Sequence, residues 1–333
     1  YARYSGRPAA VCVTSGPGAT NTLTGVMGAW QDSLPMVVLS GQVRYEISVP
    51  KSGLKLRYRG IQEFEIIPTV KNMTKYAVML TDPLAVRREL IKAIHIAMDG
   101  RRGPVWLDIP QDIQNARVEE ADLYSEEAFI SDVPQADQVQ IQDVLGMLRC
   151  AKRPCILAGS GIISSHCRDA FEQFINKMGI PVIGGAWVAD NLYAEHPLYY
   201  GNSGNVGPRT GNFILQNADV ILAIGNSLGF RQTGFNLEGF APGARIVMVD
   251  ADAEESRKPG LCIEKFVHAD VGAFIGKMLE EDCRVQAPEE WLAYCDRLKE
   301  RFTPYEGAED IEPKERVNSY YFWKIFRQYE ERD

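Results

Sequence analysis

Residues 14–21 read Thr-Ser-Gly-Pro-Gly-Ala-Thr-Asn, and this glycine-rich turn decides the fold of the first half of the chain. It follows a short apolar run at residues 9–13 and leads into a helix-like stretch at about residues 21–30. The next apolar run, residues 35–40 (PMVVLS), lacks polar alternation, which is typical of a parallel strand covered on both faces. Strand, turn, helix and strand in this order predict an open α/β sheet.

The same alternation continues along the chain. Asp82 and Pro83 provide an N-cap acid and a first-turn proline for a helix that is expected to close at Gly100, and residues 104–109 (PVWLDI) return as a strand. A second block then alternates strands with helices. Its expected strands are 155–158, 181–183, 220–224 and 245–249, and its expected helices are 168–177 and 209–217. The predicted fold class is therefore α/β, with two doubly wound parallel-sheet domains.

Composition sets the expected domain boundaries. Residues 119–139 are acidic and irregular, and residues 284–316 are polar and contain prolines, so both are interpreted as linkers. They leave one domain at 1–118, a second at 140–283, and the start of a third at 317–333. The first residue is not Met, no signal peptide is apparent, and the last residues open an apolar helix, so we expect both ends to be cuts through a larger protein.

Charge and cysteine content exclude several classes of function. A net charge of −8 argues against a non-specific nucleic-acid binder, whose affinity comes from basic surface. No segment approaches the roughly 20 apolar residues that a membrane span needs. The seven cysteines are widely spaced, which indicates neither a zinc site nor a disulfide framework and favours a reducing, cytoplasmic location. Small-molecule partners are the expected ones.

The glycine turn has a chemical use as well as a structural one. Glycines let a backbone pass close to a ligand, and the following helix N-terminus offers unpaired N–H groups and a partial positive charge. Taken alone, the string is equally compatible with a plain strand-to-helix turn. The other short strings of the chain distinguish these interpretations.

Seven strings, taken in order, resemble the acetolactate synthases, which are the large subunits of acetohydroxyacid synthase and depend on thiamine diphosphate. These strings are VTSGPGATN (13–21), DSLP (32–35), SGQV (40–43), GRRGPV (100–105), QNAD (216–219), RQTG (231–234) and VDAD (249–252). The resemblance covers almost the whole chain. It implies a partial pyrimidine-binding domain at 1–118, a central FAD- or nucleotide-binding domain at 140–283, and the start of a diphosphate-binding domain at 317–333.

The resemblance implies roles for residues near the thiamine. Pro17, Gly18 and Asn21 match positions beside the aminopyrimidine ring of a neighbouring subunit's cofactor. Gln62 matches a glutamine of a Phe-Gln-Glu string that points at the reaction centre, where an amide can hydrogen-bond a developing alkoxide without titrating. The alternative is a loop glutamine in solvent. Lys75 matches a lysine near the substrate channel, and its alternative is a solvated surface lysine.

Further implied contacts lie mostly in the central domain. Arg231 matches an arginine that holds the carboxylate of the second keto acid, a task suited to a planar guanidinium. Here it follows Gly229 and Phe230, where the family has two aspartates. The family's Gly-Met-His-Gly string is also changed, because residues 204–207 read Gly-Asn-Val-Gly. The positions that match FAD or nucleotide contacts are Arg101, Gly159, Gly161, Gly185, Ala186, Trp187, Gly204, Gly225, Asp250 and Asp270.

Two elements of the family are missing from the chain. One is a glutamate that would precede Tyr1 and protonates the aminopyrimidine, and the other is the third domain, whose Gly-Asp-Gly…Asn motif holds Mg²⁺ and the diphosphate. The chain would therefore supply no metal ligand and would be inactive alone. Its implied cofactors are thiamine diphosphate, Mg²⁺ through the third domain, and FAD as a structural relic.

The resemblance implies a carboligase of branched-chain amino acid biosynthesis. It decarboxylates pyruvate, a 2-keto acid, transfers the hydroxyethyl unit to a second carbonyl compound, and works as a homodimer or homotetramer. Two alternatives remain open. The basic loop at residues 44–59 could meet a diphosphate, which would suit a nucleotide-linked keto sugar as acceptor. The chain could also be a non-catalytic nucleotide-binding module.

Overall fold

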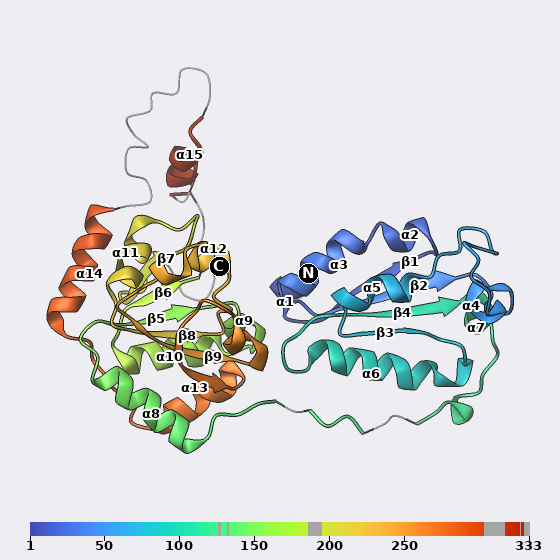
Figure 1. The fold of residues 1–333 in the computed structure, drawn as a ribbon, viewed down its shortest axis with the longest axis horizontal. Coiled ribbons are helices and arrows are strands. Elements are labelled where there is room, and N and C mark those ends of the chain that lie inside the picture. The colour runs from blue at the N-terminus through green and yellow to red at the C-terminus, as the bar shows by residue number, and fades with distance from the viewer. Residues whose placement is uncertain (126–127, 132, 186–194, 303–316, 327, 330–333) are drawn as a thin grey trace. The chain divides into compact units, whose positions relative to one another are not determined.

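The computed structural model describes residues 1–333 except 126–127, 132, 186–194, 303–316, 327 and 330–333. The chain divides into two compact units, Tyr1–Pro134 and Gln135–Asp333. Each unit contains a sheet whose strand pairs are all parallel, with helices packed on the sheet (Figure 1). The predicted α/β fold class is thus confirmed.

The sheet of the first unit has four strands in the order β1-β2-β4-β3. These strands are β1 (Ala9–Val13), β2 (Met36–Gln42), β3 (Tyr76–Met79) and β4 (Pro104–Pro110). Its main helices are α2 (Pro17–Thr20), α3 (Leu23–Gln31), α5 (Ile66–Val70) and α6 (Val86–Met98). Shorter elements are α1 (Ala2–Ser5), η1 (Tyr45–Ile47), α4 (Val49–Ser52), η2 (Lys71–Met73), η3 (Pro83–Ala85), α7 (Gln111–Gln114) and η4 (Glu120–Asp122).

Both faces of this sheet are buried, which explains why its strands lack polar alternation. Val38 and Trp106 pack into a core with α3 and α5 on one face, whereas Val37 and Val105 pack with α6 on the other (Figure 1). Asp82 caps the 3-10 turn η3 that leads into α6, since its carboxylate accepts a hydrogen bond from the Leu84 N–H at 2.9 Å, whereas α6 itself begins after Ala85 without a side-chain cap. The expected helix at residues 21–30 corresponds to α3, and the short α2 precedes it.

The sheet of the second unit has six strands in the order β10-β9-β8-β5-β6-β7. Its strands are β5 (Pro154–Ala158), β6 (Val182–Gly184), β7 (Tyr199–Asn202), β8 (Val220–Ile224), β9 (Arg245–Asp250) and β10 (Ile263–His268). Its helices are α8 (Gln138–Arg149), α9 (Gly161–Ser164), α10 (Arg168–Met178), α11 (Arg209–Asn217), α12 (Phe230–Thr233), α13 (Val271–Glu280), α14 (Glu289–Arg301) and α15 (Ser319–Phe326), with 3-10 turns η5 (Leu237–Gly239) and η6 (Ala253–Arg257). β5 and β8 are adjacent, so the strand order reverses between them.

The structure places a helix within the segment that composition assigned to a linker. Residues 289–301 form α14, which has a polar outer surface but buries Trp291 and Cys295 in the core of the second unit. The indole N–H of Trp291 donates to the Pro154 carbonyl at 2.9 Å, which ties α14 to the start of β5. All seven cysteines are free. Among the helices of the described residues, none combines the length and apolar composition needed to cross a membrane.

Candidate functional site

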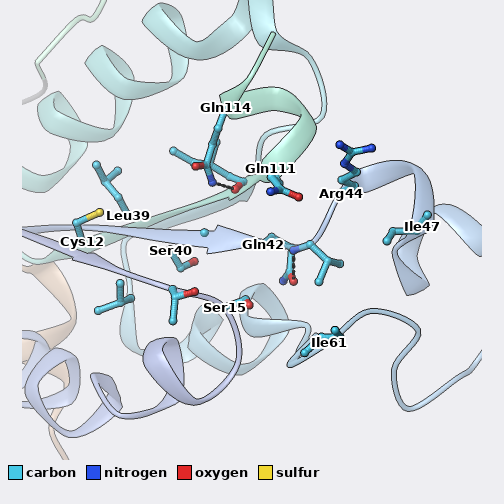
Figure 2. A pocket seen from close by; sticks show the side chains of 15 residues that line it. Cys12, Ser15, Leu39, Ser40, Gln42, Arg44, Ile47, Ile61, Gln111 and Gln114 are labelled. Carbon is cyan, nitrogen blue, oxygen red and sulfur yellow. Dashed lines mark hydrogen bonds between the residues drawn. The ribbon is translucent and has the colours of Figure 1, made fainter.

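A cavity of about 980 Å³ opens at the carboxyl ends of β1, β2 and β4 in the first unit (Figure 2). Ligands of open parallel sheets bind at this edge, because the loops that follow the strands converge there. The lining is apolar and uncharged polar apart from one arginine. It consists of Cys12, Val13, Thr14, Ser15, Leu39, Ser40, Gly41, Gln42, Val43, Arg44, Ile47, Ile61, Ile109, Gln111 and Gln114. Such a lining fits a neutral, hydrogen-bonding heterocycle better than a highly charged group.

A buried carboxylate supports two of the lining side chains. Ser40 Oγ donates to Asp108 Oδ1 at 2.5 Å, and Gln42 Nε2 donates to Asp108 Oδ2 at 3.0 Å. Trp106 donates its indole N–H to Ser40 Oγ at 2.8 Å. Asp108 is fully buried, and burial raises its pKa to about 6 against the lowering effect of these two hydrogen bonds. The sequence analysis did not single out Asp108, because it reads as one residue of an apolar strand.

The glycine turn and Gln62 lie side by side. A β-carbon on Gly16 would stand 2.2 Å from the backbone oxygen of Gln62, a contact that only glycine allows. Gly16 also has φ +56°, and Gln62 itself has φ +59°, a left-handed conformation that is uncommon outside glycine. Two segments that are far apart in the sequence are therefore adjacent. Ile61 lines the cavity, whereas Gln62 itself is exposed and is not one of the lining residues.

The predicted thiamine-contacting residues lie beside this cavity. Thr14 and Ser15 form part of its lining, and Pro17 and Asn21, which follow directly, are exposed. Gly18 packs on the turn, since a β-carbon there would be 2.8 Å from Thr14 Cγ2. Thr14 and Ser15 of the turn thus line the cavity, whereas Gly16 and Ala19 are buried.

Two carboxylates hold the long loop that forms one wall of the cavity. Glu63 accepts backbone hydrogen bonds from Val49, Arg59 and Gly60 at 2.5, 2.7 and 2.8 Å. Burial alone would raise the pKa of Glu63, but these donors and the Arg59 charge lower it below its ordinary value. Asp112 accepts from the Tyr45 N–H at 2.8 Å, which fixes the start of the loop. The basic composition of this loop is evident from the sequence, but its two anchors, Glu63 and Asp112, are not.

Lys75 and Arg101 lie at the opposite, amino edge of the same sheet and do not line the cavity. Lys75 immediately precedes β3, and its Nζ donates to the Asp99 carbonyl at 2.5 Å. Burial lowers the pKa of Lys75, although the Asp99 carboxylate acts in the other direction. Arg101 Nε donates to Ser33 Oγ at 3.0 Å. Within the first unit, the structure therefore does not bring these two residues together with Gln62.

In the second unit, most of the predicted cofactor residues line the carboxyl edge of the sheet. These residues follow or end successive strands, namely Gly159 and Gly161 after β5, Gly185 after β6, Gly204 after β7, Gly225 after β8, Asp250 at the end of β9 and Asp270 after β10. Ala186 and Trp187 were predicted here too, but they lie outside the described residues. The edge includes the point between β5 and β8 where the strand order reverses, which is the preferred ligand crevice of such sheets.

Three of these glycines, Gly159, Gly161 and Gly225, are needed for close contacts between loops. A β-carbon on Gly159 would stand 1.9 Å from the Gly225 oxygen, and one on Gly161 would stand 2.6 Å from the Gly225 α-carbon. These glycines are required whether or not a ligand binds. Asp270 caps α13 by accepting from the Ala273 N–H at 3.0 Å, and it also accepts from Ser165 Oγ at 2.7 Å. Close packing of Gly159, Gly161 and Gly225 and the capping role of Asp270 thus explain these four residues without a ligand.

Arg231 is an exposed residue of α12, at the same edge of the second sheet, whereas Gln232 and Thr233 of this helix are buried. Its backbone carbonyl accepts from the Asn205 N–H at 2.9 Å, which connects α12 to the loop after β7. Phe230, in one of the positions where the related family has aspartate, is exposed and stacks on Phe235 with ring centroids 5.4 Å apart. Across the residues that the structure describes, no group of three or more His, Cys, Asp or Glu side chains could hold a metal ion.

Comparison with known proteins identifies both units. Residues 1–63 match the family "thiamine pyrophosphate enzyme, N-terminal TPP binding domain", and residues 141–278 match "thiamine pyrophosphate enzyme, central domain". The acetolactate synthase large subunit of Corynebacterium glutamicum is 33% identical over 91% of the chain and 47% of its own length. The Lactococcus lactis protein of the same name is 31% identical over 95% and 54%, and glyoxylate carboligase of Escherichia coli O157:H7 is 30% identical over 90% and 50%. The chain thus spans about half the length of these relatives.

Proposed function

We propose that this chain, which belongs to the thiamine pyrophosphate enzymes and carries their N-terminal and central domains, forms part of a 2-keto-acid carboligase. The proposed reaction decarboxylates pyruvate and transfers the remaining hydroxyethyl unit to a second carbonyl compound. The three relatives described above carry the names of carboligases or acetolactate synthases, which favours this reaction over a nucleotide-binding module or a keto-sugar enzyme.

The adjacency of the Gly16 turn and Gln62, whose neighbours Ser15 and Ile61 line an open cavity, is the observation that carries this proposal. We assign Pro17, Gly18 and Asn21 to the aminopyrimidine ring of thiamine diphosphate, because turn carbonyls and amides can orient a neutral heterocycle. Bound thiamine diphosphate would supply the electron sink for decarboxylation. Gln62 would donate its amide N–H to the oxygen on which charge develops, and an amide does so without titrating.

Two cationic side chains are assigned to substrates. Arg231 would hold the carboxylate of the acceptor through paired N–H donors, and its position on α12 is exposed. Lys75 would line the channel by which substrate enters. Because Lys75 and Gln62 lie at opposite edges of one sheet, Lys75 would have to serve a site other than the cavity of its own unit.

The remaining parts of the proposal concern cofactors and assembly. FAD would bind along the carboxyl edge of the second sheet, with Gly185, Gly204 and Asp250 approached by its ribose and diphosphate portions. Arg101, in the first unit, is proposed separately as a flavin contact. Mg²⁺ would be held by a domain beyond those matched here. We further propose domains at 1–118 and 140–283, a homodimer or homotetramer, and a cytoplasmic location.

The test is an assay on protein purified from the reading frame that encodes this chain, with pyruvate, thiamine diphosphate and Mg²⁺. We expect acetolactate to form and Gln62→Ala to lower kcat by about 10²–10³-fold. Gln173→Ala, which removes an exposed amide on α10 in the second unit, should leave kcat unchanged. The proposal is rejected if no carboligation product forms from pyruvate alone or with added 2-keto acids, or if both variants lose activity equally.

A further inference from the structure

Asp108 has no role in the chemistry proposed above, yet it is the most deeply buried carboxylate beneath the cavity. Its relative exposure is 0%, and both of its oxygens are hydrogen-bonded to side chains of β2 that line the cavity. An apolar side chain at this position would hold the sheet together at a lower desolvation cost, because removing a carboxylate from water costs several kcal/mol. The fold alone therefore gives no reason for an acid here.

The hydrogen bonds of Gln42 lead from Asp108 to the loop that carries Gln62. Gln42 Nε2 donates to Asp108 and also to the Phe64 carbonyl at 2.9 Å, while Oε1 accepts from the Val43 N–H at 2.9 Å. Every hydrogen-bonding atom of the Gln42 side chain is thus engaged. Phe64 lies two residues beyond Gln62. The orientation of Gln42 therefore fixes the position of Phe64 in the same segment whose Gln62 contacts the glycine turn.

We propose that Asp108 is a positioning residue that orients Gln42 and, through the Phe64 carbonyl, keeps Gln62 beside the glycine turn at the cavity. The assignment of Gln62 to the reaction rests on the proposed function. The tether between Asp108 and the loop does not, because it is a property of the first unit alone. Its test can therefore be made without cofactor or substrate, and its failure is distinguishable from a failure of the proposed reaction.

The experiment is hydrogen–deuterium exchange on the 333-residue chain and three variants, comparing residues 59–65 with helix α6. Asp108→Ala removes both acceptors and should raise exchange in 59–65 at least tenfold while leaving α6 unchanged. Asp108→Asn keeps one carbonyl oxygen for Gln42 and should restore exchange to within about threefold of the wild type. Ser40→Ala removes the other partner of the carboxylate and should also stay within about threefold.

The proposal is overturned if Asp108→Ala leaves exchange in residues 59–65 unchanged, or raises it in α6 by the same factor. It is also overturned if Asp108→Asn behaves like Asp108→Ala. Should Asp108→Ala fail to fold, Gln42→Leu interrupts the same tether while retaining the acid. That variant must then loosen residues 59–65 without loosening α6, and equal exchange in both segments rejects the tether.

Discussion

The backbone of Gly16 lies against the carbonyl group of Gln62 so closely that a β-carbon on residue 16 would stand 2.2 Å from that oxygen. The two residues come from separate segments, one the turn after β1 and the other the end of a long loop. Their contact needs glycine for lack of space, and the turn needs glycine again because its φ is +56°. Any side chain at residue 16 would separate the two segments that form this side of the cavity.

Gly16→Ala is therefore expected to destabilise the protein by at least about 2 kcal/mol, since it combines a backbone clash with a strained left-handed conformation. Urea denaturation measures the change in the free energy of unfolding. Gly28→Ala is the matched control, because Gly28 lies within α3 and a β-carbon there meets no atom within 4 Å. That change should stabilise by about 0.5–1 kcal/mol. Equal effects of the two substitutions would contradict the contact.

Replacing Gln62 with glycine should increase stability and decrease activity. Its φ of +59° is strained for any residue with a β-carbon, so Gln62→Gly should relieve about 1 kcal/mol of strain, reduced by the greater entropy of the unfolded chain. Gln62→Ala keeps the strain and should not gain stability. Both variants lose the amide and should lose carboligase activity to a similar extent. Unfolding experiments and a kcat measurement on the same preparations test this, and an active Gln62→Gly variant would speak against a role for the amide.

The fold was largely predictable from the sequence because burial on both faces leaves a plain signal in the strands. Residues 35–40 and 104–109 are apolar except for Ser40 and Asp108, and the structure packs alternate apolar residues of each into different cores. Helix α14 gave no such signal. Its outer surface is charged, and one narrow stripe that includes Trp291 and Cys295 packs on the sheet, so composition alone resembled a linker.

The part of the candidate site formed by the glycine turn could be predicted from the sequence, whereas the part that depends on strand register could not. The turn at Gly16 could be recognised in the sequence because few other structures need so glycine-rich a segment. Asp108, in contrast, becomes part of the site only because β4 pairs with β2 so that it lies opposite Ser40. This register cannot be predicted from the sequence of either strand alone. The left-handed conformation of Gln62 was also unpredictable, since it is imposed by the loop and not by the residue type.

Glu63 should stabilise the loop only while it is ionised. Its folded pKa is lowered by three backbone donors, so its contribution is fully present above the ordinary pKa of 4.5 and is lost as pH falls through the folded value. Glu63→Gln should cost about 1–3 kcal/mol at pH 7, because buried N–H groups lose their acceptor. The difference between wild type and variant should shrink below about pH 4.5. Glu65→Gln, at an exposed position nearby, is the control and should leave the free energy of unfolding at pH 7 unchanged.

Ionisation of Asp108 should destabilise the protein, in contrast to ionisation of Glu63, because burial raises the folded pKa of Asp108 to about 6 from 3.8. Below the unfolded pKa, such a carboxyl group does not reduce the free energy of unfolding. The reduction grows as pH rises towards the folded pKa and is constant above it. Each pH unit between these values corresponds to about 1.4 kcal/mol, so the wild type should lose up to about 3 kcal/mol between about pH 4 and pH 7 relative to Asp108→Asn. Urea denaturation of both proteins across this range measures the difference.

The titration can also be observed directly, because the indole N–H of Trp106 donates to Ser40 Oγ, which in turn donates to the Asp108 carboxylate. Loss of the Asp108 proton changes the charge at the end of this chain of hydrogen bonds, and the indole N–H signal in a nuclear magnetic resonance spectrum should shift with a midpoint near pH 6. In Asp108→Asn the midpoint should disappear. A midpoint near pH 4 in the wild type would mean that the carboxylate is better solvated than its burial indicates, and the cost assigned to it would then be too large.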